Sequence, residues 1–286
     1  MVYVYDNLGK KIQINYEIIG EGKPIVMVHG LACDMNLMKG CMEPVFEKVE
    51  GYKRLYLDLP GMGKSESAEE LASSDKMMEV LLSFIKSTIS GNFLIVGESY
   101  GGYLVRGILS VIMDRIEGMA LICPVIFPEN EDRILPKKTV IKQDEGFLRE
   151  LYEKNEEETE SFLEMAVIIN KKTYDRYKKE IYSGIKISDM NFIRKLKKNY
   201  SFSFDVDKKI DKKFDRPVLF MAGKQDNITG YKQLENLCEK YSRGTMAVID
   251  ESGHNLQIEK PEIFEVLIKD WLKRILNMDY ALNKGF

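Results

Sequence analysis

The segment Gly97-Glu98-Ser99-Tyr100-Gly101 has the spacing G-x-S-x-G, in which the serine can act as a nucleophile. The apolar run 92–97 before it is typical of a strand, and residues 100–114 after it are typical of a helix. A serine on such a sharp turn is exposed, and the flanking glycines prevent Cβ clashes with the crowded backbone. The alternative is an ordinary glycine-rich turn that carries a serine, because short matches arise by chance.

A nucleophilic serine needs a general base, which is most often a histidine, and the chain contains only 2 histidines. His254 follows the predicted strand 245–250, so it should lie at the carboxyl edge of a sheet, where ligands bind. The alternative for His254 is a loop histidine satisfied by local hydrogen bonds. His29 also ends a strand, but Gly30 and Leu31 follow it, and we expect His29 to shape its loop.

The third group expected at such a site is a carboxylate that orients the histidine. Asp226 comes shortly after the apolar run 217–221 and lies between Ser99 and His254 in the chain, in the order that this type of site predicts. Asp250 is a second candidate, although it is close to the strand that carries His254, and Glu129 is a weaker one. The chemistry expected of this set is acyl transfer to a serine.

Alternating strands and helices must position these residues. Short apolar runs recur along the chain and are separated by stretches with helical periodicity, which predicts an α/β fold with a mostly parallel central sheet and helices on both faces. The alternation stops between 127 and 214, where charged, helix-favouring segments predict an inserted helical cap. We therefore expect a core of residues 1–126 and 215–286 and a cap of residues 127–214.

The composition excludes several classes of protein. The 286 residues are 44% hydrophobic and 30% charged with a net charge of −3, which argues against a disordered chain and against a nucleic-acid partner. No apolar run reaches the ~18 residues that a membrane span needs, and residues 1–20 alternate like strands rather than a signal peptide. We expect no membrane partner and a cytoplasmic location, in keeping with four scattered cysteines: Cys33, Cys41, Cys123 and Cys238.

The sequence offers no cofactor motif. Its two distant histidines lack the neighbouring cysteines or carboxylates of a metal site, so we expect no metal. The segment Gly61-Met62-Gly63-Lys64-Ser65 ends in G-K-S but lacks the spacing of a phosphate-binding loop, and no dinucleotide fingerprint occurs. We therefore expect no cofactor.

Four segments in this order resemble the α/β-hydrolase superfamily, in the branch with a helical cap that includes small carboxylesterases, carbon–carbon bond hydrolases and proline iminopeptidases. The resemblance implies the α/β-hydrolase fold and an oxyanion hole formed by the backbone N–H groups of Leu31 and Tyr100. A serine at position 99, where related epoxide hydrolases and dehalogenases carry an aspartate, argues against an alkyl-enzyme ester. The segments are His29-Gly30, 58–65, 97–102, and Gly253-His254 followed by 259–262.

Substrate choice is expected to depend on the cap. Phe127, Phe162, Met165 and Ile169 are candidate substrate-binding residues, and the last three recur at helical spacing. The same spacing fits residues that pack the interior of the cap. An apolar pocket would favour an ester of modest acyl length. Further candidates are Phe147, Tyr174 and Phe192.

The predicted function is a serine hydrolase that cleaves a small-molecule ester or a related carbonyl compound, as a monomer or a homodimer. Three alternatives stay open. An aminopeptidase of the proline-iminopeptidase type would need acidic cap residues, of which the run 156–158 and Glu164 are examples. A carbon–carbon bond hydrolase would use the same three residues, and a non-catalytic ligand-binding protein could retain them.

Overall fold

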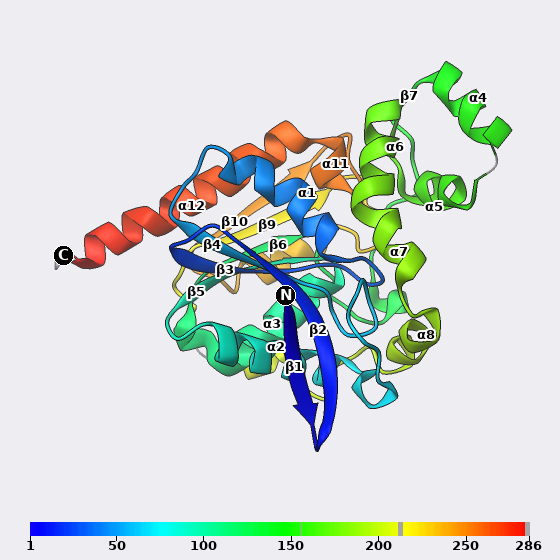
Figure 1. Ribbon diagram of the computed structural model, residues 1–286. Coiled ribbons are helices and arrows are strands. Elements are labelled where there is room, and N and C mark those ends of the chain that lie inside the picture. The colour runs from blue at the N-terminus through cyan, green and yellow to red at the C-terminus, as the bar shows by residue number, and fades with distance from the viewer. Residues whose placement is uncertain (155, 211–213, 284–286) are drawn as a thin grey trace.

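An eight-stranded sheet forms the centre of the molecule in the computed structural model, which describes residues 1–154, 156–210 and 214–283 (Figure 1). The strand order is β1-β2-β4-β3-β5-β6-β9-β10. The pairs β1–β2 and β2–β4 are antiparallel, and all later pairs in the sheet are parallel. The strands are β1 (Val2–Asn7), β2 (Lys10–Ile19), β3 (Lys23–Val28), β4 (Tyr52–Leu57), β5 (Phe93–Glu98), β6 (Ile116–Ile122), β9 (Val218–Gly223) and β10 (Gly244–Ile249).

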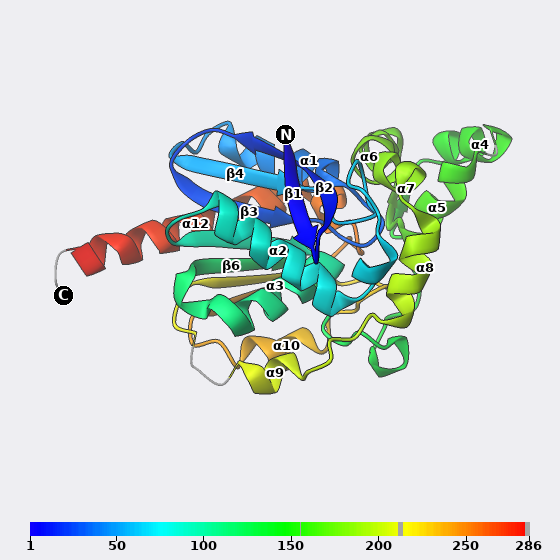
Figure 2. The same cartoon turned by 60° about the horizontal axis from the view of Figure 1, so that its bottom comes forward.

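Helices lie on both faces of the sheet (Figure 2). On each face an apolar layer packs between the helices and the strands. Every residue of β5 and β9 is buried, as continuous apolar strands of a parallel sheet should be when helices pack on both sides. The predicted α/β fold is therefore confirmed. One layer contains α1 (Met35–Phe46) and α12 (Pro261–Asn283), and the other contains α2 (Ser74–Thr88), α3 (Tyr100–Ile112) and α10 (Leu234–Cys238).

The segment between β6 and β9 contributes a group of helices beside one end of the sheet (Figure 1). It also contains a short parallel pair, β7 (Lys142–Gln143) with β8 (Ile168–Ile169), where the sequence predicted helices alone. Two-residue strands are too short to leave a periodic signal, which explains the difference. The helices beside the end of the sheet are α4 (Glu145–Lys154), α5 (Glu157–Met165), α6 (Lys171–Tyr177), the π-helix η4 (Lys178–Tyr182), α7 (Ser183–Ile187) and α8 (Met190–Lys198). The last helix of the segment, α9 (Val206–Lys209), packs instead against α3.

An aromatic stack attaches the last part of this segment to α3. The ring of Tyr200 lies 4.7 Å from that of Tyr100, and the ring of Phe202 lies 4.5 Å from that of Tyr103. Phe204 extends the stack, with its ring centre 5.0 Å from that of Phe202. Such contacts each contribute on the order of 1 kcal/mol beyond the area they bury. The chain therefore returns along α3 after Tyr200 before it enters β9.

Two buried polar residues organise the loops at this end of the sheet. His29 Nδ1–H donates to the Gly30 carbonyl at 2.7 Å, and His29 Nε2 accepts the Leu59 N–H at 3.0 Å. Burial lowers the pKa of His29, in agreement with a neutral ring that both donates and accepts. Asp58 accepts the Met35 N–H at 2.8 Å at the start of α1. His29 thus shapes its loop, as the sequence analysis expected.

Within the described ranges, the structure has no helix with both the length and the apolar character needed to cross a bilayer.

Candidate active site

Ser99 lies on the turn between β5 and α3 with φ 51° and ψ −116°, outside the regions where residues with side chains normally lie. Its backbone N–H donates to the Ile122 carbonyl at 2.9 Å, and its carbonyl accepts the Val125 N–H at 3.0 Å. These bonds to the end of β6 and the residues after it hold the turn. The Ser99 side chain makes no capping bond to α3, so its hydroxyl is available for other contacts.

Two glycines of the motif are required by close approach of the backbone. A Cβ atom at position 97 would lie 2.6 Å from the Gly101 carbonyl oxygen, and one at position 101 would lie 2.3 Å from the Val28 carbonyl oxygen. Neither backbone can retreat, because β3, β5 and α3 are packed together. The turn therefore requires glycine at both positions, which explains why glycines flank the serine in the G-x-S-x-G motif.

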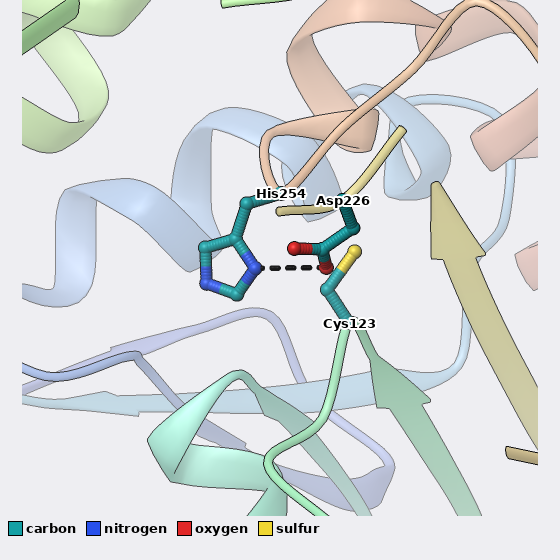
Figure 3. A group of neighbouring side chains, drawn as sticks. All are labelled: Cys123, Asp226 and His254. Carbon is teal, nitrogen blue, oxygen red and sulfur yellow. Dashed lines mark hydrogen bonds and ion pairs between the residues drawn. The ribbon is translucent and has the colours of Figure 1, made fainter. Parts of the chain in front are cut away.

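Three side chains from separate loops form a continuous hydrogen-bonded chain. Ser99 Oγ lies 2.9 Å from His254 Nε2, and His254 Nδ1 lies 3.0 Å from Asp226 Oδ2. Figure 3 shows the imidazole ring with its Nδ1 side facing the Asp226 carboxylate. The residues follow β5, β9 and β10, whose carboxyl ends meet at one edge of the parallel sheet. The structure thus brings together the three residues that the sequence analysis selected.

Asp226 is held as a carboxylate by donors on both oxygens. Its Oδ1 accepts the N–H groups of Ile228 at 2.9 Å and Thr229 at 3.0 Å, and its Oδ2 accepts the Thr229 hydroxyl at 2.7 Å as well as His254. Burial alone would raise the pKa of Asp226, but the charge of His254 and these hydrogen bonds outweigh it and lower the pKa. The carboxylate is therefore ionised and fixed in orientation.

His254 is a strong proton acceptor in this setting. Burial would lower its pKa, but the charge and hydrogen bond of Asp226, followed by the charge of Glu98, raise that pKa to about 9. An imidazole fixed between a hydroxyl and a carboxylate can take the hydroxyl proton and then be stabilised as an imidazolium. The arrangement can therefore generate a serine nucleophile.

Cys123 lies beside this pair at the end of β6, with its thiol near Asp226 (Figure 3). One ligand atom from each of Cys123, Asp226 and His254 lies within 4.8 Å of the others, which is compact enough for a metal ion. The hydrogen bonds indicate another use for two of these groups: Asp226 Oδ2 already bonds to His254 Nδ1 at 3.0 Å and accepts the Thr229 hydroxyl at 2.7 Å.

A cavity of about 490 Å³ opens over Ser99. Leu31 lies in its wall, and Tyr100 N–H belongs to the first turn of α3, where amide hydrogens have no acceptor within the helix. The positive end of the helix dipole also points here. Amide donors at such a position can stabilise an oxyanion. The other lining residues include Gly30, Cys33, Leu37, Val125, Ile181, Ile185 and Tyr200.

The predicted substrate-binding residues lie in different surroundings. Met165 lines the cavity, whereas Phe162 and Ile169 are buried among the helices that follow β6. The Phe162 ring packs against those of Tyr174 and Tyr177, with centres 5.2 and 5.4 Å away. Phe127 is 39% exposed and does not line this cavity. Of the four residues, the structure brings only Met165 to the space over Ser99.

The two alternative carboxylates lie apart from His254. Asp250 is exposed and accepts a hydrogen bond from Gln225 at 2.8 Å. Glu129 lines the cavity and accepts the Ser201 hydroxyl at 2.6 Å. Among the three candidates, Asp226 is thus the one whose oxygen reaches the imidazole.

Sequence reasoning gave no role to three residues that shape this site. Thr229 orients Asp226, and Arg133 lines the cavity while donating to the carbonyls of Phe127, Pro128 and Ile228. Arg133 has no recognisable motif around it, so the sequence carries no signal for it. Glu98 occupies the variable position of the serine motif, and its burial in the cavity wall could be anticipated only from the all-buried strand that it ends.

Comparison with known proteins places this geometry in a family. The family model described as "alpha/beta hydrolase fold" matches residues 23–261, which span every residue of the hydrogen-bonded chain. The chain belongs to the alpha/beta hydrolase fold family. The predicted superfamily is thereby confirmed, and with it the assignment to hydrolytic enzymes.

Individual relatives agree with this assignment. The crystal structure of an alpha/beta superfamily hydrolase from Oenococcus oeni PSU-1 superposes with a TM-score of 0.83 at 33% identity, covering 92% of this chain and 96% of that one. Monoacylglycerol lipase ABHD6 of Homo sapiens is 22% identical, over 91% of this chain and 78% of its own. The 2-hydroxy-6-oxo-6-(2'-aminophenyl)hexa-2,4-dienoic acid hydrolase of Metapseudomonas resinovorans is 23% identical, over 92% and 88%.

Proposed function

We propose that this alpha/beta hydrolase cleaves a small-molecule ester through a serine acyl-enzyme. The observation that carries the proposal is the unbroken chain from Ser99 Oγ through the His254 ring to Asp226, with bonds of 2.9 and 3.0 Å, at the floor of a cavity. A serine without such a base is a weak nucleophile at neutral pH, so attack of Ser99 on an ester requires the contact with His254.

The proposed reaction has two halves. His254 Nε2 removes the Ser99 proton while Ser99 Oγ attacks the ester carbonyl carbon, and the backbone N–H groups of Leu31 and Tyr100 hold the oxyanion that forms. His254 then passes its proton to the alcohol oxygen, and the alcohol departs and leaves the acyl group on Ser99. Water, deprotonated by His254, attacks the acyl carbonyl, and the proton returns to Ser99 as the acid leaves. Asp226 fixes the tautomer and stabilises the imidazolium in both halves.

The cavity supports a small, partly apolar substrate. Its volume of about 490 Å³ is within the range of small-molecule sites, and Leu37, Ile181 and Ile185 give it an apolar side. We also propose that the predicted cap, residues 127–214, selects the substrate, since Met165, Ile181 and Ile185 come from that segment. The lipase name of one relative agrees with an ester substrate.

A carbon–carbon bond hydrolase is the second candidate, favoured by the similarity to the dienoic acid hydrolase over most of both chains. Such an enzyme would use the same three residues to break a carbon–carbon bond next to a ketone. For the aminopeptidase alternative, the acidic run 156–158 and Glu164 do not line the cavity over Ser99, whereas two other acidic cap residues, Glu129 and Glu131, do. The proline anilide in the substrate panel therefore tests this alternative directly.

The experiment is a substrate panel with the purified protein: p-nitrophenyl esters from acetate to octanoate, a vinylogous 1,5-diketone acid and proline p-nitroanilide. We expect ester turnover with a preference for short or medium acyl chains. Faster turnover of the diketone, measured as kcat/KM, would overturn the ester assignment in favour of the second candidate. Turnover of the anilide alone would favour the aminopeptidase.

We further propose a reducing, cytoplasmic location, which the four unpaired cysteines support.

A further inference from the structure

Glu98 places a second carboxyl group at the imidazole of His254. It is the last residue of β5, directly before Ser99, and its side chain is 3% exposed. Its Oε1 lies 3.6 Å from His254 Nε2, the same nitrogen that contacts the Ser99 hydroxyl. The ring therefore has a carboxyl group at each nitrogen: Asp226 at Nδ1 and Glu98 at Nε2.

The loop that carries Leu31 holds the Glu98 side chain in place. The Gly30 N–H donates to the Glu98 carboxyl group. A Cβ atom at position 30 would lie 2.2 Å from Glu98 Oε2, so this carboxyl group fills the space that a side chain at position 30 would need. Both residues line the cavity over Ser99. The fixed contact between Gly30 and Glu98 makes the position of the charge a property of the fold.

We infer that Glu98 is a positioning residue of the site, whose carboxylate stabilises the His254 imidazolium from the Nε2 side and so sets the pH at which Ser99 becomes reactive. This inference rests on the proposed function, since it assigns a role in the same proton transfer. Two unlike charges at 3.6 Å interact strongly even at the effective dielectric of a protein surface.

His254 is the cation that interacts with the Glu98 carboxylate. Burial raises the pKa of Glu98 to about 7, although the charge of His254 acts to lower it. Glu98 therefore ionises within the pH range in which enzymes work. Asp226 is the other charged group that acts on it, and Arg133 acts on His254 from the cavity wall. Burial raises the pKa of each remaining neighbour, which keeps them neutral at neutral pH: Cys33, Cys41, Cys123 and Tyr200.

The test compares Glu98→Gln with the wild type and with Glu117→Gln. Glutamine keeps the size of the side chain and an oxygen for the Gly30 N–H, and it loses only the charge. Glu117 is a matched control, because it is a partly buried carboxylate on β6 that binds Lys23 and Asn92, far from the strand ends that form the site. The rate constant for labelling of Ser99 by a fluorophosphonate is measured from pH 5 to 10, alongside kcat/KM for an ester.

The pH profile of Glu98→Gln is expected to be displaced from that of the wild type. Loss of the charge lowers the pKa of His254, so the rise in reactivity of Glu98→Gln moves to lower pH by one pH unit or more. Its plateau at high pH then falls by up to about tenfold per pH unit, because the imidazolium in the transition state is less stable. At a pH below the pKa that His254 has in either protein, the variant reacts at least as fast as the wild type. Glu117→Gln follows the wild type throughout.

A uniform fall in rate at every pH, with no movement of the profile, would show that Glu98 is merely structural and would overturn the inference. Equal profiles for wild type and variant would overturn it too. Absence of labelling at Ser99 in the wild type would instead refute the proposed function. His254 can also be titrated directly by NMR, because the chain has only 2 histidines and His29 serves as an internal reference. An unchanged pKa of His254 in Glu98→Gln contradicts the inference without reference to activity.

Discussion

Replacing Glu259 by glutamine is expected to release the loop that carries His254. Glu259 ends α11 (Leu256–Glu259) and is buried against two parts of the chain. Its Oε1 accepts the N–H groups of Val167 at 2.6 Å and Ile168 at 3.1 Å, and its Oε2 accepts the Gly253 N–H at 2.7 Å. One carboxylate thus joins β8, in the predicted cap, to the residue before His254.

The expected magnitude follows from the donors. A glutamine side chain has one oxygen, so its NH₂ group must face either Gly253 or the pair Val167 and Ile168. At least one buried N–H then loses its acceptor and meets another donor. An unsatisfied buried donor costs about 1–3 kcal/mol, and hydrogen bonds to a carboxylate are stronger than those to a neutral acceptor. We therefore expect the free energy of unfolding to fall by about 2–3 kcal/mol.

The activity should fall as well, because Gly253 is the neighbour of His254. A displacement of the imidazole by part of an ångström would lower kcat by about 10–10²-fold with a smaller change in KM. The assays are urea unfolding and ester kinetics on the same preparations. Glu262→Gln is the control, since its side chain is 79% exposed on the next helix. If Glu259→Gln and Glu262→Gln both remain within about 0.5 kcal/mol of the wild type, this reasoning is refuted.

Three further predictions concern the site and the cavity. Asp226→Asn should lower kcat by about 10⁴-fold, because the amide NH₂ turns to His254 Nδ1, away from the N–H groups of Ile228 and Thr229, and imposes the wrong tautomer; ester kinetics with a normal unfolding curve check this, and a loss below tenfold contradicts it. Because the pKa of His254 is raised to about 9 in the folded protein, its contribution to stability is full below its unfolded pKa of about 6.5 and is lost as the pH rises through 9. Unfolding of wild type and His254→Gln at several pH values tests this, and a wild-type advantage that grows with pH would have the wrong sign. Met165→Ala should change the preference for acyl chain length, whereas Phe162→Ala, in the packed interior, should cost about 3–5 kcal/mol of stability; the reverse pattern in an ester series and a urea titration would contradict the assignment of Met165 to the cavity wall.

The arrangement of Ser99, Asp226 and His254 could be predicted because each follows an apolar strand, and the carboxyl ends of parallel strands meet at one edge. The parallel sheet itself could be predicted from the same apolar strands. The cavity wall could not be predicted in this way: Phe162 and Met165 share helical spacing, and that spacing does not distinguish a side chain that lines a cavity from one that packs against Tyr174 and Tyr177.

Two contacts of the site depend on positions that no local pattern contains. Glu259 bonds to Val167 and Ile168, about 90 residues earlier in the chain, so the contact requires the packing of β8 against α11. Glu98 was visible within the serine motif, but its approach to His254 Nε2 follows from the relative positions of β5 and the loop after β10. Such contacts arise from tertiary packing, which local periodicity does not encode.

The most direct test of the central claim is the activity of Ser99→Ala together with fluorophosphonate labelling of the wild type. The account predicts that the wild type hydrolyses a short p-nitrophenyl ester, that Ser99→Ala loses on the order of 10³-fold or more in kcat/KM, and that mass spectrometry finds the label on Ser99. Equal hydrolysis by both proteins, or a label on another residue, would contradict the claim that Ser99 is the nucleophile.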